Sequence, residues 1–141
     1  KKIREIMNNN KKKIWILSGE TSGDVYGAEL SMALMANSNY DIDISGMGGE
    51  NMRKAGVNIL VDSTELGVVG LIEVFKNIFK FIKIFRFLLK KAVNERPAVV
   101  ILIDYPGFNL RFAKQLHKRN IKVIWYVSRK FGFGAKNEYI N

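Results

Sequence analysis

Asp104 is the residue of this chain that is best placed to do chemistry. It directly follows the most apolar run, residues 98–103, and precedes a turn that contains Pro106, Gly107 and Asn109. A carboxylate at the carboxyl end of a buried strand stands where open α/β sheets form their sites, in apolar surroundings suited to a general base. A helix cap or a partner for a nearby lysine is the structural alternative for Asp104.

The second candidate is the glycine-rich run at residues 18–24, Ser-Gly-Glu-Thr-Ser-Gly-Asp. It lies between the apolar residues 14–17 and a helical pattern. At such a strand-to-helix turn, glycines let the backbone approach a bound group, and the helix presents unpaired N–H donors. The run is neither a P-loop nor a Gly-x-Gly-x-x-Gly dinucleotide site. A tight turn with Asp24 as the helix N-cap is the alternative.

Two further glycine turns follow later strands. Residues 46–49 read Gly-Met-Gly-Gly at the end of the second predicted strand, and residues 67–70 read Gly-Val-Val-Gly. Glu20 in the first loop and Glu73 after the third are secondary acidic candidates. Three glycine loops and one carboxylate at the same edge of a sheet predict a binding cleft.

The order of apolar runs predicts how these residues are positioned. Runs rich in β-branched residues alternate with helix-period segments, which is typical of βαβ units around a parallel sheet. Strands are predicted at residues 13–17, 41–45, 58–61, 98–103 and 122–127, and helices at residues 24–36, 50–55, 71–94 and 109–119. The predicted fold class is therefore α/β, a Rossmann-like parallel sheet with helices on both faces.

Composition limits the classes of function. The 141 residues are 48% hydrophobic, contain no cysteine and include one histidine, His117. We therefore expect one folded domain and no disulfide scaffold or metal site, with His117 exposed on a helix. Residues 1–12 are basic and lack the apolar core of a signal peptide, so they are predicted to be disordered. The net charge of +10 predicts an anionic partner.

Much of this charge lies in the long predicted helix. At about 100° per residue, its basic residues form one stripe, which consists of Lys76, Lys80, Lys83, Arg86 and Lys90. The opposite face is apolar and wide, and it consists of Ile78, Phe81, Ile82, Phe85, Leu88 and Leu89. Phe79 and Phe87 fall within the basic stripe. Phenylalanines among lysines favour a helix that lies in a membrane interface, while the frequent charges exclude a transmembrane span.

Two other interpretations of this helix remain. A large core helix whose lysines face water explains the pattern without a membrane. Nucleic-acid binding explains the charge, but its stacking aromatics usually stand on strands or loops, and no helix-turn-helix, RRM or KH pattern is present. We therefore expect no nucleic-acid partner. The predicted membrane-interface residues are Phe75, Phe79, Lys80, Ile82, Lys83, Arg86 and Phe87.

Several motifs in register resemble one family. Residues 18–24, 46–52 with 55–56, 65–70 with 73–74, 103–109 and 126–128 occur in the order and spacing found in lipid-A-disaccharide synthases. The resemblance spans about residues 13–128.

The resemblance implies an enzyme of lipid A biosynthesis. Members are GT-B glycosyltransferases, peripherally associated with the cytoplasmic face of the inner membrane. They transfer 2,3-diacylglucosamine from UDP to lipid X (2,3-diacylglucosamine 1-phosphate) with inversion and release of UDP, and need no cofactor. The family's proposed general base falls on Asp104. The implied substrate-binding residues are Gly19, Glu20, Ser22, Gly23, Asp24, Gly48, Gly49, Gly70, Glu73, Asn109 and Ser128.

The sequence departs from the family in two ways. The 141 residues resemble the N-terminal half of the family, and we expect its C-terminal UDP-sugar domain to be absent. The resemblance then implies a truncated, inactive acceptor-side half, or alternatively a non-catalytic membrane-interface binding module. Residues 129–141 also lack the family's two tryptophans, and restoring one adenine to a hypothetical codon run near Lys130 recovers that pattern. We therefore hypothesise a frame-shifted tail. Oligomeric state and acyl-chain length are not predicted.

Overall fold

The computed structural model of the chain describes residues 11–66, 78–126 and 138–140. These residues form one six-stranded sheet with the order β3-β2-β1-β4-β5-β6. Strands β1 to β5 are parallel, and β6 is antiparallel to β5. The strands are β1 (Lys12–Ser18), β2 (Ile42–Gly48), β3 (Asn58–Asp62), β4 (Val99–Ile103), β5 (Val123–Tyr126) and β6 (Glu138–Ile140).

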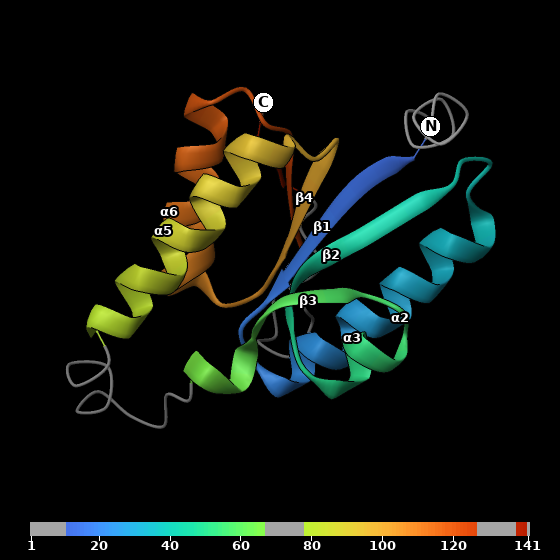
Figure 1. Ribbon diagram of the computed structural model, residues 1–141, viewed down its shortest axis with the longest axis horizontal. Helices are drawn as coiled ribbons and strands as arrows, with labels where there is room; N and C mark the ends of the chain where they lie inside the picture. Colours follow the sequence, from blue (N-terminus) through green and yellow to red (C-terminus); the bar gives the residue numbers. More distant parts are fainter. Residues whose placement is uncertain (1–10, 67–77, 127–137, 141) are drawn as a thin grey trace, which may run out of the picture.

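Helices cover both faces of this sheet (Figure 1). One face carries two helices, α2 (Thr21–Asn37) and α3 (Glu50–Lys54), and the other carries α5 (Ile78–Glu95) and α6 (Pro106–Lys118). A short 3-10 helix, η1 (Ser63–Leu66), follows β3. The predicted Rossmann-like α/β fold is confirmed, with all five predicted strands present.

The sheet separates two apolar cores. On one side, Trp15 and Leu17 of β1 pack with residues of α5 and α6, and on the other, Ile14 and Ile16 pack with residues of α2 and α3. Because β1 and β4 are central strands with helices above and below, their apolar runs need no polar alternation. This burial explains why residues 98–103 read as a continuous apolar segment.

Several predicted boundaries are wrong, each for a local reason. Helix α2 begins three residues earlier than predicted, because Glu20 takes the extended backbone of an N-cap. Helix α6 begins at Pro106, whose fixed φ and missing N–H suit the first helical turn. Strand β2 continues to Gly48, so Gly46 and Gly48 belong to the strand rather than to a turn.

Gly46 is required by close packing of neighbouring strands. A Cβ at this position would collide with the backbone carbonyl of Ile16, and the β2–β3 register shifts between Gly46 and Met47. A glycine inside a strand often marks such a bulge or a close approach of backbones. The first glycine of the Gly-Met-Gly-Gly run is therefore explained by the packing of neighbouring strands and not by a turn.

The predicted helix at residues 71–94 is described from Ile78 onward, and its earlier residues lie outside the described part. Within the described residues, no helix is long and apolar enough to cross a membrane. The edge strand β6 and helix η1 were not predicted.

Candidate functional site

The carboxyl ends of the parallel strands meet at one edge of the sheet. Strand β1 ends at Ser18, β2 at Gly48 and β4 at Ile103, and helices α2, α3 and α6 start just beyond these ends. The loops that follow β1, β2 and β4 thus lie together, as the sequence predicted. This edge is where open α/β sheets bind ligands.

Asp104 and Tyr105 form a strained turn after β4. Their φ angles are 47° and 49°, in the left-handed region that residues with a Cβ rarely adopt. Each such residue costs roughly 1–2 kcal/mol, so the surrounding structure must hold the turn in place. Asp104 is 4% exposed. Strain of this kind in two successive residues clusters at functional sites.

Hydrogen bonds to the backbone hold this turn. Asn109 is fully buried, and its Nδ2 donates to the carbonyls of Ile103 (3.2 Å) and Asp104 (2.9 Å). Trp125 Nε1 donates weakly to the Asp104 carbonyl at 3.4 Å. The Asp104 N–H donates to the Tyr126 carbonyl at 2.9 Å. Asn109 thus supports the backbone of the residue proposed as the base, and its contact with substrate stays a prediction.

Tyr105 lies in the candidate site, although the sequence analysis did not single it out. Its ring covers Gly19, where a Cβ would lie only 2.6 Å from two ring carbons. Burial, and then the nearby carboxylate of Glu20, raise the pKa of the Tyr105 phenol above its ordinary value of 10.0. The ring therefore joins the β1 loop to the β4 loop. Its position directly after Asp104 is the sequence feature that could have pointed to it.

The first glycine loop is held by bonds to one carbonyl. The Glu20 carbonyl accepts from Ser18 Oγ (3.1 Å) and from the Asp24 N–H (3.0 Å). Gly23 is buried, and a Cβ there would collide with the Ser18 hydroxyl. The Glu20 side chain is exposed and Ser22 is half-buried. These last two are the predicted loop residues whose side chains reach the surface.

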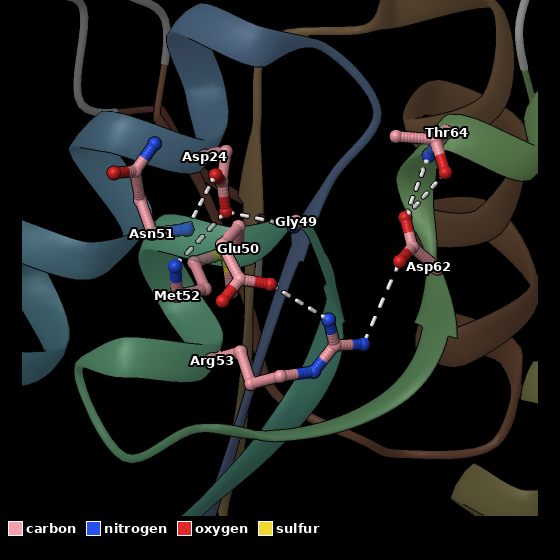
Figure 2. Close-up of polar contacts among 8 residues, drawn as sticks. All are labelled: Asp24, Gly49, Glu50, Asn51, Met52, Arg53, Asp62 and Thr64. Carbon is pink, nitrogen blue, oxygen red and sulfur yellow. Dashed lines mark hydrogen bonds and ion pairs between the residues drawn. The ribbon is translucent and has the colours of Figure 1, made fainter.

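Asp24 does not cap its own helix, contrary to the alternative raised from the sequence. It is 4% exposed, and its carboxylate accepts hydrogen bonds from the backbone N–H groups of Gly49 (2.7 Å), Asn51 (3.0 Å) and Met52 (3.1 Å). Figure 2 shows these three bonds converging on one side chain. Gly48 is buried beside Met52, whose sulfur occupies the place of a Cβ. Asp24 thus joins the first two glycine loops.

A second polar network flanks this one (Figure 2). Arg53 forms ion pairs with Glu50 (3.1 Å) and Asp62 (3.5 Å). Asp62 Oδ1 accepts from both the backbone N–H (3.0 Å) and the hydroxyl (2.7 Å) of Thr64. The hydrogen bonds from Thr64, and then the charge of Arg53, lower the pKa of Asp62 below its ordinary value of 3.8.

The outer face of α5 combines basic and aromatic side chains. Phe79 is 83% exposed and Phe87 is 48% exposed, beside the exposed Lys80, Lys83 and Arg86. This mixture is the one expected from the sequence.

The buried face of α5 is narrower than predicted. Ile84, Leu88 and Ala92 are buried, but Ile78 and Ile82 of the predicted apolar face are exposed. Phe81 and Phe85 are half-buried, and they pack edge-on against Phe108 or Phe112 of α6. Because α5 contacts the sheet and α6 along one stripe, its wide apolar surface continues onto the exposed side.

Gly70, Glu73, Phe75 and Ser128 lie outside the described residues. His117 is exposed on α6, as predicted. Among the residues described, no group of three or more histidine, cysteine or acidic side chains could hold a metal ion.

Comparison with known proteins identifies the family to which the sequence is similar. A sequence model of the family described as lipid-A-disaccharide synthetase matches residues 14–130. Relatives named lipid-A-disaccharide synthase include one from Koribacter versatilis (strain Ellin345), 45% identical over 116 residues, and one from Trichlorobacter lovleyi (strain ATCC BAA-1151 / DSM 17278 / SZ), 44% identical over 117 residues. These matches cover 82% and 83% of this chain, but 30% of each relative, so the chain spans about 30% of their length.

Solved structures support the fold alone. A deacetylase of the teicoplanin biosynthesis pathway, in complex with bog, aligns with a TM-score of 0.51 at 7% identity. The alignment covers 92% of this chain and 72% of that one. At this identity the similarity concerns the arrangement of strands and helices, not the chemistry.

Proposed function

Because this chain belongs to the lipid-A-disaccharide synthetase family, we propose that it forms the acceptor-side domain of a GT-B glycosyltransferase of lipid A biosynthesis. The acceptor would be lipid X and the donor UDP-2,3-diacylglucosamine. The observation that supports this proposal is Asp104, a buried carboxylate in a strained turn at the carboxyl edge of the sheet. The glycine loop after β1 lies against the same turn through Tyr105.

In the proposed reaction, Asp104 is the general base. The acceptor 6-hydroxyl attacks C1 of the donor sugar as Asp104 removes its proton, the bond from C1 to the UDP oxygen breaks, and UDP leaves. Inversion needs one base on the face opposite the leaving group, and one carboxylate supplies it. The backbone bonds around Asp104 fix its position, which lowers the entropic cost of aligning base and hydroxyl.

Transfer is proposed for a protein that also contains the rest of the family's length, since this chain spans about 30% of its relatives. A donor bound by that remaining part would face the edge that carries Asp104. The chain by itself is proposed to bind the acceptor without transferring sugar.

A membrane-interface role for α5 fits this substrate class. Exposed Phe79 and Phe87 would insert among acyl chains, and Lys80, Lys83 and Arg86 would meet anionic headgroups. We propose peripheral association with the cytoplasmic face of the inner membrane. A membrane-interface binding module without catalysis is the second candidate, and it rests on this surface alone.

Vesicle co-sedimentation tests the proposed function. We expect the chain to bind vesicles that contain lipid X several-fold more tightly than phosphatidylglycerol vesicles of equal surface charge. Asp104→Asn should keep this preference, because the base acts on a hydroxyl rather than holding the lipid. Equal binding to both vesicles would favour the non-catalytic module. Displacement of the chain from both by RNA would favour nucleic-acid binding.

A further inference from the structure

Asp24 is a buried acidic residue whose side-chain bonds all reach a helix other than its own. It stands in the first turn of α2, whereas its three donors, the N–H groups of Gly49, Asn51 and Met52, belong to the start of α3. The N-cap of α3 is Gly49, which has no side chain to offer. Asp24, 25 positions earlier in the sequence, supplies the missing cap.

The start of α3 is therefore closed by the chain's own carboxylate. Helix N-termini attract anions, and hydrogen bonds from N–H groups to a carboxylate are stronger than those between neutral groups. There is little room for a second ligand, because a Cβ at Gly49 would lie 3.0 Å from Asp24 Oδ2. An anionic substrate group could bind the N–H of Gly49 only by displacing Asp24.

Asp24 is also bonded to the first glycine loop. Its N–H donates to the Glu20 carbonyl at 3.0 Å, and the Ser18 hydroxyl donates to the same carbonyl at 3.1 Å. The preceding Gly23 packs against Ser18 and Ile103. One residue thus connects the loop after β1, through its main chain, to the loop after β2, through its side chain.

We propose that Asp24 is a positioning residue: by locking the second glycine loop onto α2, it holds residues 19–23 in the shape that meets the acceptor, without touching the acceptor itself. This inference rests on the proposed function. It reassigns Asp24 and Gly49 from substrate contact to support of the first loop.

Chemical rescue tests this role. Asp24→Ala leaves a space the size of a small carboxylate, bordered by three N–H groups, which formate can fill. We expect Asp24→Ala to lower Tm by about 5 °C or more and to weaken retention on lipid X vesicles about tenfold, with chloride as the anion. Formate at equal ionic strength should restore both properties, with the same half-saturating concentration.

Three proteins serve as controls. Asp24→Asn keeps the volume and one acceptor oxygen but turns an NH2 group toward the Asn51 N–H, and it leaves no space for formate, so formate should not rescue it. Wild type and Asp43→Ala, which removes an exposed carboxylate, should not respond to formate. Hydrogen exchange at Gly49, Asn51 and Met52 should quicken in Asp24→Ala and slow again with formate.

The other possible results of the rescue experiment would contradict the positioning role of Asp24 or the proposed function. Rescue of Tm without any change in lipid X affinity would make Asp24 a structural cap only and overturn the positioning role. An Asp24→Ala chain that stays destabilised or unfolded in saturating formate contradicts the proposal as well. If wild type does not prefer lipid X vesicles, the proposed function fails, and rescue of Tm and amide protection alone decides whether Asp24 locks the two loops.

Discussion

At the scale of single residues, the candidate site depends on the left-handed backbone of Asp104 and Tyr105 and on the hydrogen bonds that hold it. The sequence placed Asp104 correctly at the end of the central apolar strand. It could not reveal that Asp104 and Tyr105 adopt left-handed φ angles, because these angles depend on hydrogen bonds with residues outside the turn, such as Asn109 and Tyr126. For the same reason, the sequence did not show that the Asn109 amide bonds the turn after β4 or that the Asp24 carboxylate bonds the start of α3. The type of a residue shows which hydrogen bonds its side chain can make, but the fold decides which partner is within reach.

Tyr105 gives a titration prediction. Burial and the Glu20 charge raise its pKa, so the folded state holds the phenol proton more tightly than the unfolded state does. The stability that this proton contributes is full below pH 10 and is lost as pH rises through the raised pKa. The difference in phenolate absorbance between wild type and Tyr105→Phe should show a midpoint above 10.0.

Glu20→Gln separates the two causes of this shift. Removing the smaller cause, the carboxylate, should lower the midpoint of Tyr105 while leaving it above 10.0, because burial remains. A midpoint that is unchanged by Glu20→Gln would mean that the carboxylate does not act on the ring.

Asn109→Ala tests the support of the strained turn. The change removes two buried hydrogen bonds to backbone carbonyls, which should cost about 2–3 kcal/mol of unfolding free energy. Urea denaturation measures it. Asn51→Ala is the control, because Asn51 is exposed and its hydrogen bonds to described residues come from its backbone rather than its side chain. A similar cost in both variants would argue against the described role of Asn109.

At the scale of elements, α5 serves two surfaces at once. Its inner stripe packs on the sheet and α6, while its outer stripe carries exposed phenylalanines among basic residues. The sequence showed that the apolar face was unusually wide, but not where the buried part ended. The edge of the buried part depends on which residues of α5 are covered by α6. The periodicity of the α5 sequence carries no information about the position of α6.

Phe85 and Phe79 should separate these two surfaces. Phe85→Ala removes a ring packed against Phe108 and Phe112 and should cost about 2–4 kcal/mol of unfolding free energy. Phe79→Ala removes a ring that is 83% exposed, so it should leave stability within about 0.5 kcal/mol but reduce vesicle binding. Denaturation and co-sedimentation of both variants measure this. Unchanged vesicle binding by Phe79→Ala would count against the membrane role.

The junction between β3 and η1 gives a pH-dependent prediction. Asp62 caps η1 through Thr64, so Asp62→Asn should cost about 1 kcal/mol near neutral pH. Because the folded-state pKa is lowered, this stability is present above pH 3.8 and is lost as pH falls through the folded-state value. Stability curves of wild type and variant should therefore converge in acid. A gap that stays constant would contradict the cap.

At the scale of the whole molecule, the parallel sheet was predictable because local sequence patterns determine it. Apolar β-branched runs alternate with helical segments, and right-handed connections then leave few arrangements. The edge strand β6 was not predictable, since its pairing with β5 depends on tertiary contact rather than on a strong local pattern. The convergence of the loops after β1, β2 and β4 followed from the topology. The topology did not predict the contacts between these loops, such as the hydrogen bonds from the start of α3 to Asp24.

The central claim is that this sheet edge carries the base of a glycosyl transfer. Its most direct test is UDP release by a fusion of this domain to the remaining part of the Koribacter versatilis relative, with lipid X and UDP-2,3-diacylglucosamine as substrates. We predict transfer by the fusion, and a fall in kcat of about 10²-fold to 10⁴-fold in Asp104→Asn with KM for lipid X nearly unchanged. Asp104→Asn that transfers at the rate of the unmodified fusion would contradict the account.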